Sequence, residues 1–307
     1  MTTIAVTGAS GFCGSYVATA AAALGADVLC VGRRPGPVGR HIPWDAARTT
    51  PDLSGADVVV HCAAAVGDPV PGSASEAAMR SVNVDGTARL LEAAAGRRVV
   101  WVSSASVYAP GPGRARITEE HPVRGQLNAY GRTKAAGEAL ALAAGAVVLR
   151  PRAVYGVGDP HLVPRLLSRV RRGLLLLPGP SVRLSLTAVE NLADACLAAV
   201  DWPPGAYNIA DPAPYDRDAA VQTVLRAHST PARIRHLPLR AARAAAAVTE
   251  SLARVRPDED PPLTRYAVDQ LAHSVVLDVS KARSRGWTPL RTLSDYPAAL
   301  IAATVTG

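Results

Sequence analysis

The chain has 307 residues, of which 49% are hydrophobic and 19% charged, so we expect a folded globular protein of one or two domains. The net charge is +8, but arginines spread along the whole sequence carry nearly all of the positive charge, and aromatic residues make up only 4%. This pattern argues against nucleic-acid binding. No charged leader precedes the first apolar segment, and no apolar run is typical of an integral membrane segment. We therefore expect a cytoplasmic protein.

Four cysteines, at positions 13, 30, 62 and 196, are scattered along the sequence. None of them forms a C-x-x-C pair, and most fall in apolar segments. This spacing predicts free thiols in a reducing compartment and no metal site.

Residues 7–14, with the sequence TGASGFCG, follow a short apolar run and precede an alanine-rich segment. The order predicts a strand, a glycine turn and a helix. Gly8 would let the chain turn off the strand, Gly11 would let backbone N–H groups approach a pyrophosphate, and Gly14 would let the helix pack close to the sheet. Unpaired N–H groups at the helix N-terminus favour phosphate. The pattern therefore favours a dinucleotide-binding turn over a tight turn without a ligand.

The end of the second strand, expected over residues 27–31, bears on the choice of cofactor. The strand is followed by Gly32, Arg33 and Arg34. An acidic residue here would bind an adenosine ribose 2′-OH, whereas arginines suit a 2′-phosphate. We therefore predict NADP(H), with NAD less favoured; the alternative is that both arginines are merely solvated. Asp45 is a candidate contact for the adenine amino group.

The next expected strand, over residues 57–62, is followed by Ala63 and Ala64. Small residues past the carboxyl end of a parallel strand leave room for a ligand. His61, at the end of this strand, is interpreted as a structural residue. Residues 79–95 predict one long helix, in which Asn83 has a reason to occur only if its side chain forms a hydrogen bond.

Residues expected to carry out chemistry follow the strand at 98–102. Tyr130 and Lys134 are four residues apart on an expected helix over 130–144, so both side chains lie on one face. A phenol, with a pKa near ~10, is a poor acid–base at neutral pH, but a nearby ammonium favours the phenolate and lowers that pKa. A serine after the strand can donate a hydrogen bond to a substrate oxygen. This combination predicts an acid–base site.

Six motifs, in order along the first half of the chain, resemble the extended short-chain dehydrogenase/reductase family, also called the NAD-dependent epimerase/dehydratase family. They are TGASGFCG at 7–14, HCAA at 61–64, NVDGT at 83–87, VSSASVY at 102–108, YGRTK at 130–134 and LRPRAVYG at 149–156. The resemblance implies that Tyr130 is the catalytic acid/base, that Lys134 activates it and that Asn83 lies near the active site. Ser104 matches the family's serine or threonine, with Ser103 and Ser106 as alternatives.

The same resemblance implies a set of cofactor-binding residues. The backbone of the glycine turn would meet the pyrophosphate, and the segment that contains Pro151, Ala153 and Val154 would touch the nicotinamide carboxamide. Together with the two arginines and Asp45 named above, the set is Gly8, Ser10, Gly11, Phe12, Cys13, Gly14, Ala63, Ala64, Tyr130, Lys134, Pro151, Ala153 and Val154.

The resemblance implies an α/β fold: a Rossmann-type doubly wound parallel sheet with a smaller, discontinuous C-terminal substrate domain. Residues 1–155 plus about 185–210 would bind the dinucleotide, and about 156–184 plus 211–307 would bind the substrate. A homodimer is usual for the family. Residues 240–256 form an alanine-rich segment with Val248, Leu252 and Val255 on one helical stripe. We expect an ordinary packed helix there; a lid and a membrane-surface helix are the alternatives.

The second half of the chain is similar to bacterial relatives of 3-beta-hydroxysteroid dehydrogenase, including reductases of 2-alkyl-3-ketoalkanoic acids. The predicted function is an NADP(H)-dependent oxidoreductase that interconverts a secondary alcohol and a ketone on a hydrophobic metabolite, such as a steroid, β-keto acid or polyketide. A nucleotide-sugar epimerase with retained NAD(P) is the alternative. Ala105 and Ser106 stand where a dehydratase would have Asp-Glu, which disfavours dehydration. A non-catalytic NADP-binding protein is disfavoured by the tyrosine–lysine pair.

Overall fold

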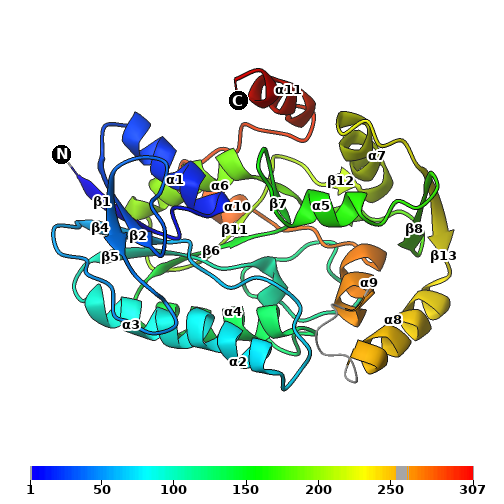
Figure 1. Ribbon diagram of the computed structural model, residues 1–307, viewed down its shortest axis with the longest axis horizontal. Helices are drawn as coiled ribbons and strands as arrows, with labels where there is room; N and C mark the ends of the chain where they lie inside the picture. Colours follow the sequence, from blue (N-terminus) through cyan, green and yellow to red (C-terminus); the bar gives the residue numbers. More distant parts are fainter. Residues whose placement is uncertain (1, 254–260, 262, 307) are drawn as a thin grey trace.

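The computed structural model describes residues 2–253, 261 and 263–306. Its central feature is a parallel seven-stranded sheet with the strand order β11-β6-β5-β4-β1-β2-β3 (Figure 1). The strands are β1 (Thr3–Thr7), β2 (Asp27–Gly32), β3 (Arg40–Pro43), β4 (Val58–His61), β5 (Arg98–Val102), β6 (Val147–Pro151) and β11 (Gly205–Ile209). Most are continuously apolar because both faces of the sheet are buried. This arrangement confirms the predicted doubly wound α/β fold.

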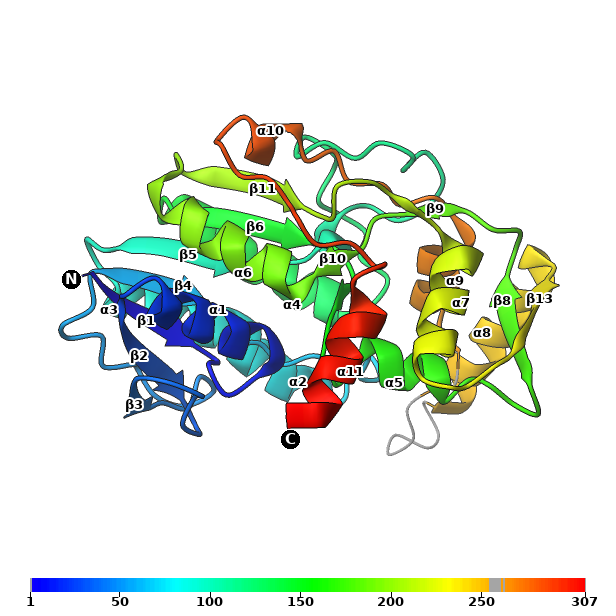
Figure 2. The same ribbon diagram turned by 90° about the horizontal axis from the view of Figure 1, so that it is seen from above.

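Helices cover both faces of the sheet (Figures 1 and 2). On one face, α1 (Phe12–Ala23) and α6 (Val189–Ala198) pack side by side and bury Val17 and Leu192 against the strands. On the other face, α3 (Gly86–Ala93) and α4 (Ala129–Ala143) bury Leu90 and Ala141 around Trp101. The order of the strands reverses between β1 and β4, so a ligand crevice is expected at the carboxyl ends of these two strands.

The single helix predicted over residues 79–95 is wrong at its start and in its middle. The helical segment begins with α2 (Ala74–Arg80), whose N-cap Ser73 accepts a hydrogen bond from the Glu76 N–H at 3.2 Å. A π-helical turn at Ser81–Asp85 then separates α2 from α3. Such turns frequently mark functional positions, and this one contains Asn83.

The rest of the chain forms a smaller part of short paired strands and helices, most of which lie on the right of Figure 1. The strand pairs are β7 (Val154–Tyr155) with β10 (Thr187–Ala188), β9 (Arg183–Leu184) with β12 (Tyr215–Asp216), and β8 (Leu174–Pro178) with β13 (Arg233–Leu237). The helices are α5 (Leu162–Leu167), α7 (Arg217–Ala227), α8 (Leu239–Ala253), α9 (Arg265–Ala272) and α11 (Tyr296–Thr306). Two 3₁₀ turns, η2 (Ala105–Val107) and η3 (Ala199–Asp201), belong to the sheet region.

Helix α10 (Ser280–Arg283) packs with the main sheet, although the expected domain split assigns it to the substrate-binding part. Its Ala282, together with Trp287, is buried in the core between the main sheet and α6. The Lys281 ammonium donates to the carbonyl of Ala206 on β11 at 2.8 Å. The packing therefore places residues around 280–287 with the dinucleotide-binding part, whereas the sequence had assigned all of 211–307 to the substrate part.

Helix α8 packs on α9 through its alanines, of which Ala242 and Ala246 are buried. The larger apolar residues of the predicted stripe face solvent instead, since Val248 is 58% and Leu252 61% exposed. Val255 and the end of the predicted segment at 254–256 lie outside the described residues. Among the helices that the structure describes, none is long and apolar enough to cross a membrane.

Candidate active site

The glycine turn after β1 has the geometry of a phosphate cradle. Gly8 has a φ of +68°, and its N–H donates to the carbonyl of Val31 on β2 at 2.9 Å. A Cβ on Gly14 would lie 2.2 Å from the Gly8 oxygen. The start of α1 can therefore approach the turn this closely only because residue 14 is a glycine. Gly11 is the N-cap of α1 and forms no side-chain capping bond. Because no side chain occupies this cap, the N-terminal N–H groups of α1 suit the pyrophosphate of a dinucleotide.

The end of β4 is fixed against the glycine turn. The Thr7 hydroxyl lies 2.7 Å from His61 Nδ1 and accepts a hydrogen bond from the Ala63 N–H at 3.2 Å. Burial lowers the pKa of His61 to about 3, so the ring is a neutral structural group, as expected from the sequence. Ala63 lies so close to Gly8 that a Cβ on this glycine would come within 2.8 Å of the Ala63 Cα. Ala63 and Ala64 thus border the crevice between β1 and β4.

Asn83 uses both ends of its buried amide within the protein. Its Oδ1 accepts from the Ala65 N–H at 2.7 Å, while its Nδ2 donates to the Ala65 carbonyl at 2.9 Å and to the Thr133 hydroxyl at 3.0 Å. The amide therefore joins the loop after β4 to helix α4, on the turn next to Tyr130. These bonds explain the asparagine in mid-helix, while its role in the active site stays a prediction.

The structure brings Tyr130 and Ser104 together. Tyr130 lies in the first turn of α4, which Asn128 caps by accepting a hydrogen bond from the Gly131 N–H at 2.9 Å. Ser104 follows β5, and its hydroxyl shares a hydrogen bond with the Tyr130 phenol. The hydroxyl of the alternative candidate, Ser103, instead donates to the buried carboxylate of Glu138.

Burial, rather than Lys134, dominates the pKa of Tyr130, so the activation of Tyr130 by Lys134 stays a prediction. The Lys134 Nζ donates to the Val102 carbonyl at 2.7 Å and lies 3.7 Å from the centre of the Trp101 ring. Burial lowers the pKa of Lys134 to about 7, so the ammonium is partly deprotonated near neutral pH. Burial raises the pKa of Tyr130 above its ordinary value, and the Ser104 hydrogen bond opposes this only in part. The phenol is accordingly protonated and able to act as an acid.

A second tyrosine, missed by the sequence reasoning, reaches the same place from the C-terminal part of the chain. The Tyr266 hydroxyl, in the first turn of α9, lies 2.6 Å from the hydroxyl of Ser106. The Ser104 hydroxyl in turn donates to Ser106 at 3.0 Å. The resemblance found for the second half of the chain gave this tyrosine no role.

Residues expected near the adenosine lie at the carboxyl ends of β2 and β3. Arg33 and Arg34 are exposed just past β2. Asp45 accepts a hydrogen bond from the Ala47 N–H at 3.0 Å and lies 3.7 Å from the exposed Arg48, so its carboxylate stabilises its own turn. The arginines are thus free to meet a phosphate, whereas the adenine contact by Asp45 stays a prediction.

The remaining predicted cofactor residues lie around the same sheet edge. Ser10 belongs to the glycine turn, and Phe12 packs edge-on against Tyr16 with 5.8 Å between ring centres. Burial raises the pKa of the Cys13 thiol to about 12, so this thiol stays neutral.

The nicotinamide segment follows β6, which ends at Pro151. Ala153 has a φ of +47°, a left-handed backbone that an alanine adopts only under strain, and Val154 begins β7. Strain of this kind is concentrated at functional sites.

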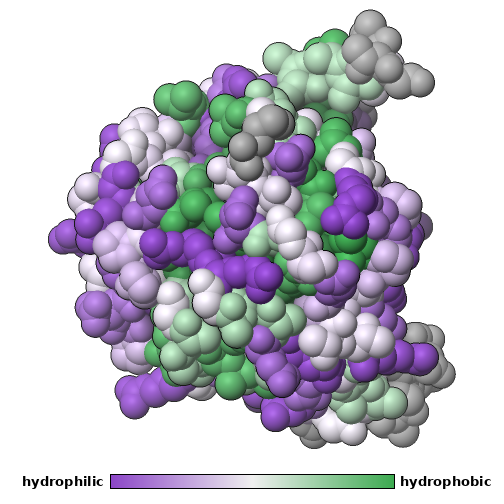
Figure 3. Space-filling view, turned by 90° about the vertical axis from the view of Figure 1, so that its left-hand side faces the viewer, coloured by the Kyte–Doolittle hydropathy of each residue, from purple (hydrophilic) through white to green (hydrophobic). Residues whose placement is uncertain are grey.

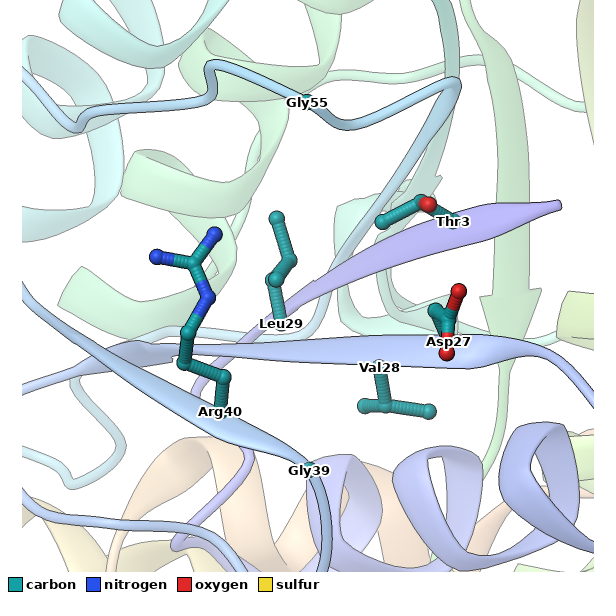
Figure 4. Close-up of a pocket in the computed structure, with 7 residues that line it drawn as sticks. All are labelled: Thr3, Asp27, Val28, Leu29, Gly39, Arg40 and Gly55. Atoms are coloured by element: carbon teal, nitrogen blue, oxygen red, sulfur yellow. The ribbon is translucent and has the colours of Figure 1, made fainter.

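Two hollows differ in their relation to this site. A 330 Å³ hollow lined by Thr3, Asp27 and Arg40 lies at the amino ends of β1, β2 and β3, away from the glycine turn (Figure 4). Figure 3 shows the face on the left of Figure 1, where hydrophilic and hydrophobic residues are interspersed. A 370 Å³ pocket is lined by Thr264 and Ala267, on either side of Tyr266 in the sequence, and by residues of α5.

Comparison with known proteins gives consistent results. The model of the NAD dependent epimerase/dehydratase family matches residues 4–210. The chain is 32% identical over 244 residues to 4-hydroxy-2-methyl-3-oxo-4-farnesyl-3,4-dihydroquinoline-1-oxide ketoreductase of Stigmatella aurantiaca, covering 75% of this chain and 72% of that protein. It is 30% identical over 317 residues to 2-alkyl-3-oxoalkanoate reductase of Shewanella oneidensis, covering 91% and 80%. Its fold matches MoeE5 in complex with UDP-glucose and NAD, with a TM-score of 0.74, 26% identity and coverage of 100% and 99%.

A parallel sheet with a glycine turn at its switch point, and a tyrosine–serine pair beside it, define an NAD(P)-dependent dehydrogenase or reductase that acts on CH–OH or keto groups. The chain belongs to the NAD dependent epimerase/dehydratase family, since the family model matches more than half of its residues. This result confirms the resemblance found in the sequence.

Proposed function

We propose that the protein is an NADP(H)-dependent reductase that interconverts a ketone and a secondary alcohol on a hydrophobic metabolite of the steroid, β-keto acid or polyketide type. The hydrogen bond between Tyr130 and Ser104 carries the proposal, because one substrate oxygen could meet a protonated phenol and a second hydroxyl there. The two reductases named above support the keto group as the site of reaction.

The chain's own residues have distinct tasks in this proposal. The bound dinucleotide supplies the hydride to the carbonyl carbon. Tyr130 donates its phenolic proton to the carbonyl oxygen, and Ser104 orients that oxygen by hydrogen bonding. Lys134 would bind the nicotinamide ribose through its Nζ, which donates to the Val102 carbonyl in this structure. In its protonated form it would also activate Tyr130. Asn83 positions α4 rather than touching the reacting atoms.

The cofactor would be held by the segments at the carboxyl edge of the sheet. The turn from Gly8 to Gly14 would bind the pyrophosphate, Arg33 and Arg34 a 2′-phosphate, and the segment from Pro151 to Val154 the carboxamide. The domain split, with residues around 280–287 moved to the dinucleotide-binding part, and the homodimer stay proposals of the same kind.

A nucleotide-sugar epimerase is the second candidate, because the chain shares its whole fold with MoeE5, which was solved with UDP-glucose and NAD. The two functions differ in cofactor stoichiometry: a reductase consumes one NADPH for each ketone, whereas an epimerase consumes none.

The deciding experiment is a screen with NADPH and NADH over 3-oxo acids, keto-steroids and UDP-sugars, read by both nicotinamide absorbance and product analysis. Stoichiometric NADPH oxidation with a ketone supports the reductase. Epimerised UDP-sugar without cofactor consumption would overturn it, and a preference for NADH would overturn the role given to the two arginines.

A further inference from the structure

Ser106 and Tyr266 lie beside the proposed catalytic pair, yet the proposed reaction uses neither of them. The Ser104 hydroxyl donates to Ser106 at 3.0 Å and also accepts from the Ser106 N–H at 3.1 Å. The Ser106 hydroxyl is 2.6 Å from that of Tyr266. With the bond between Tyr130 and Ser104, four hydroxyl groups form a continuous row from α4 to α9.

The row ends with one hydroxyl hydrogen that its own bonds do not use. The Ser104 hydrogen points to Ser106 in this structure and to the carbonyl oxygen in the proposed reaction, so in neither case does it serve the bond between Ser106 and Tyr266. One hydrogen bond joins these two hydroxyls, which carry two hydrogens between them. Whichever of the two donates, the other hydrogen is left for a further acceptor. Burial raises the pKa of Tyr266, so its phenol stays a protonated donor.

Tyr266 is held firmly at this position. Thr264 caps α9 by accepting from the Ala267 N–H at 3.1 Å. Further along the helix, Asp269 accepts from the Gly111 N–H at 2.9 Å and pairs with the buried guanidinium of Arg114 at 2.6 Å. The contacts tie the start of α9 to the segment between β5 and α4, which also supplies Ser104 and Ser106.

Charged groups of both signs act on the Tyr266 phenol. Arg152 lowers the pKa of the phenol, whereas Asp68 and Asp269 raise it. The buried Arg152 guanidinium itself donates to the carbonyls of Ser185 and Gln270, at 2.7 and 3.1 Å.

We propose that the Ser106–Tyr266 pair binds a second oxygen of the substrate, on the carbon next but one to the reacting carbonyl. The inference rests on the proposed function and narrows its substrate class to 3-oxo acids and 3-oxo esters. Two hydrogen-bond lengths separate Ser104 from Tyr266, which suits oxygens on alternate carbons better than oxygens on neighbouring carbons.

Binding of product alcohols to the enzyme saturated with NADPH tests the inference without turnover. The probes are 3-hydroxyoctanoate, its methyl ester and 2-heptanol, which has the same skeleton without the carboxyl group, and calorimetry measures each Kd. We expect the acid and the ester to bind about tenfold or more tightly than 2-heptanol. Tyr266→Phe should remove about tenfold of that advantage, and Ser106→Ala combined with Tyr266→Phe should remove the rest.

Tyr207→Phe is the matched control, because it also deletes a buried tyrosine hydroxyl with one hydrogen bond, to the Pro203 carbonyl at 2.9 Å. It should leave all three Kd values unchanged. Equal binding of the three probes by the wild type would overturn the inference whatever the variants do, and so would an equal loss for 2-heptanol and the ester in Tyr266→Phe. If 2-heptanone still drives NADPH oxidation, the reductase proposal survives such a result; if no ketone does, that proposal fails independently.

Discussion

The guanidinium of Arg114 lies 2.6 Å from the carboxylate of Asp269, although 155 residues separate them in the sequence. The side chains are only 2% and 8% exposed. The pair fastens α9 to the segment after β5, and Tyr266 is thereby held against Ser106. The candidate active site thus contains residues from both the segment after β5 and helix α9.

Removing one member of this pair should be costly. Asp269→Ala leaves the Arg114 guanidinium buried without its anion, and we expect a loss of about 3–5 kcal/mol in the free energy of unfolding. Denaturant unfolding measures it. The matched variant is Glu76→Ala, which breaks the more exposed pair with Arg132 (22% and 39% exposed) and should cost about 0–1 kcal/mol. Equal losses in the two variants would contradict the structural role of the buried pair.

Gly14→Ala should destroy the phosphate cradle. The added Cβ would lie 2.2 Å from the Gly8 oxygen, so the turn must open, and we expect the Kd for NADPH to rise about 100-fold. The control is Gly25→Ala. Its φ of +81° makes alanine strained there, with a cost of about 1–2 kcal/mol in stability, but its Cβ meets no atom within 4 Å. NADPH affinity equal in both variants would show that the cradle is not the binding site.

Arg33→Ala combined with Arg34→Ala should change cofactor preference. Loss of charge-assisted bonds to a 2′-phosphate should raise the Kd for NADPH by about 10- to 100-fold and leave that for NADH unchanged. Arg285→Ala, which removes another exposed arginine, should alter neither value. A similar rise for both cofactors in the double variant would mean that the two arginines do not distinguish them.

The sequence was sufficient for those features that carry a local signal. The glycine turn could be predicted because Gly8, Gly11 and Gly14 stand between an apolar strand and an alanine-rich helix. The doubly wound parallel sheet followed from the family resemblance and from apolar strands that are buried on both faces, whereas its number of strands was not predicted. Tyr130 and Ser104 were recognisable from motifs around them, although the position of the serine rested on alignment alone.

Features that depend on distant contacts could not be predicted. Nothing near Tyr266 indicates that it meets Ser106, which is 160 residues away. The π-helical turn at Asn83 forms where the amide bonds Ala65 and Thr133, both remote in the sequence. The low pKa of Lys134 results from burial against Trp101, which helical spacing does not reveal.

Buried Lys134 should make stability depend on pH in the cofactor-free protein. Its pKa falls from 10.5 to about 7 on folding, so between these values the unfolded chain holds a proton that the folded chain lacks. The free energy of unfolding should therefore rise with pH, by up to about 1.4 kcal/mol per unit between about pH 7 and pH 9, relative to Lys134→Met. Lys281→Met, at the only other lysine, which is half-buried, is the control. Parallel profiles for the wild type and Lys134→Met would contradict the buried ammonium.

The proposed role of Tyr130 as proton donor is tested most directly by Tyr130→Phe, measured as NADPH consumed and alcohol formed with a ketone that the wild type reduces. Loss of the acid should lower kcat by about 10²–10⁴-fold, while the Kd for NADPH, the fold and the stability stay close to wild type. A variant that retains the wild-type rate would contradict the account.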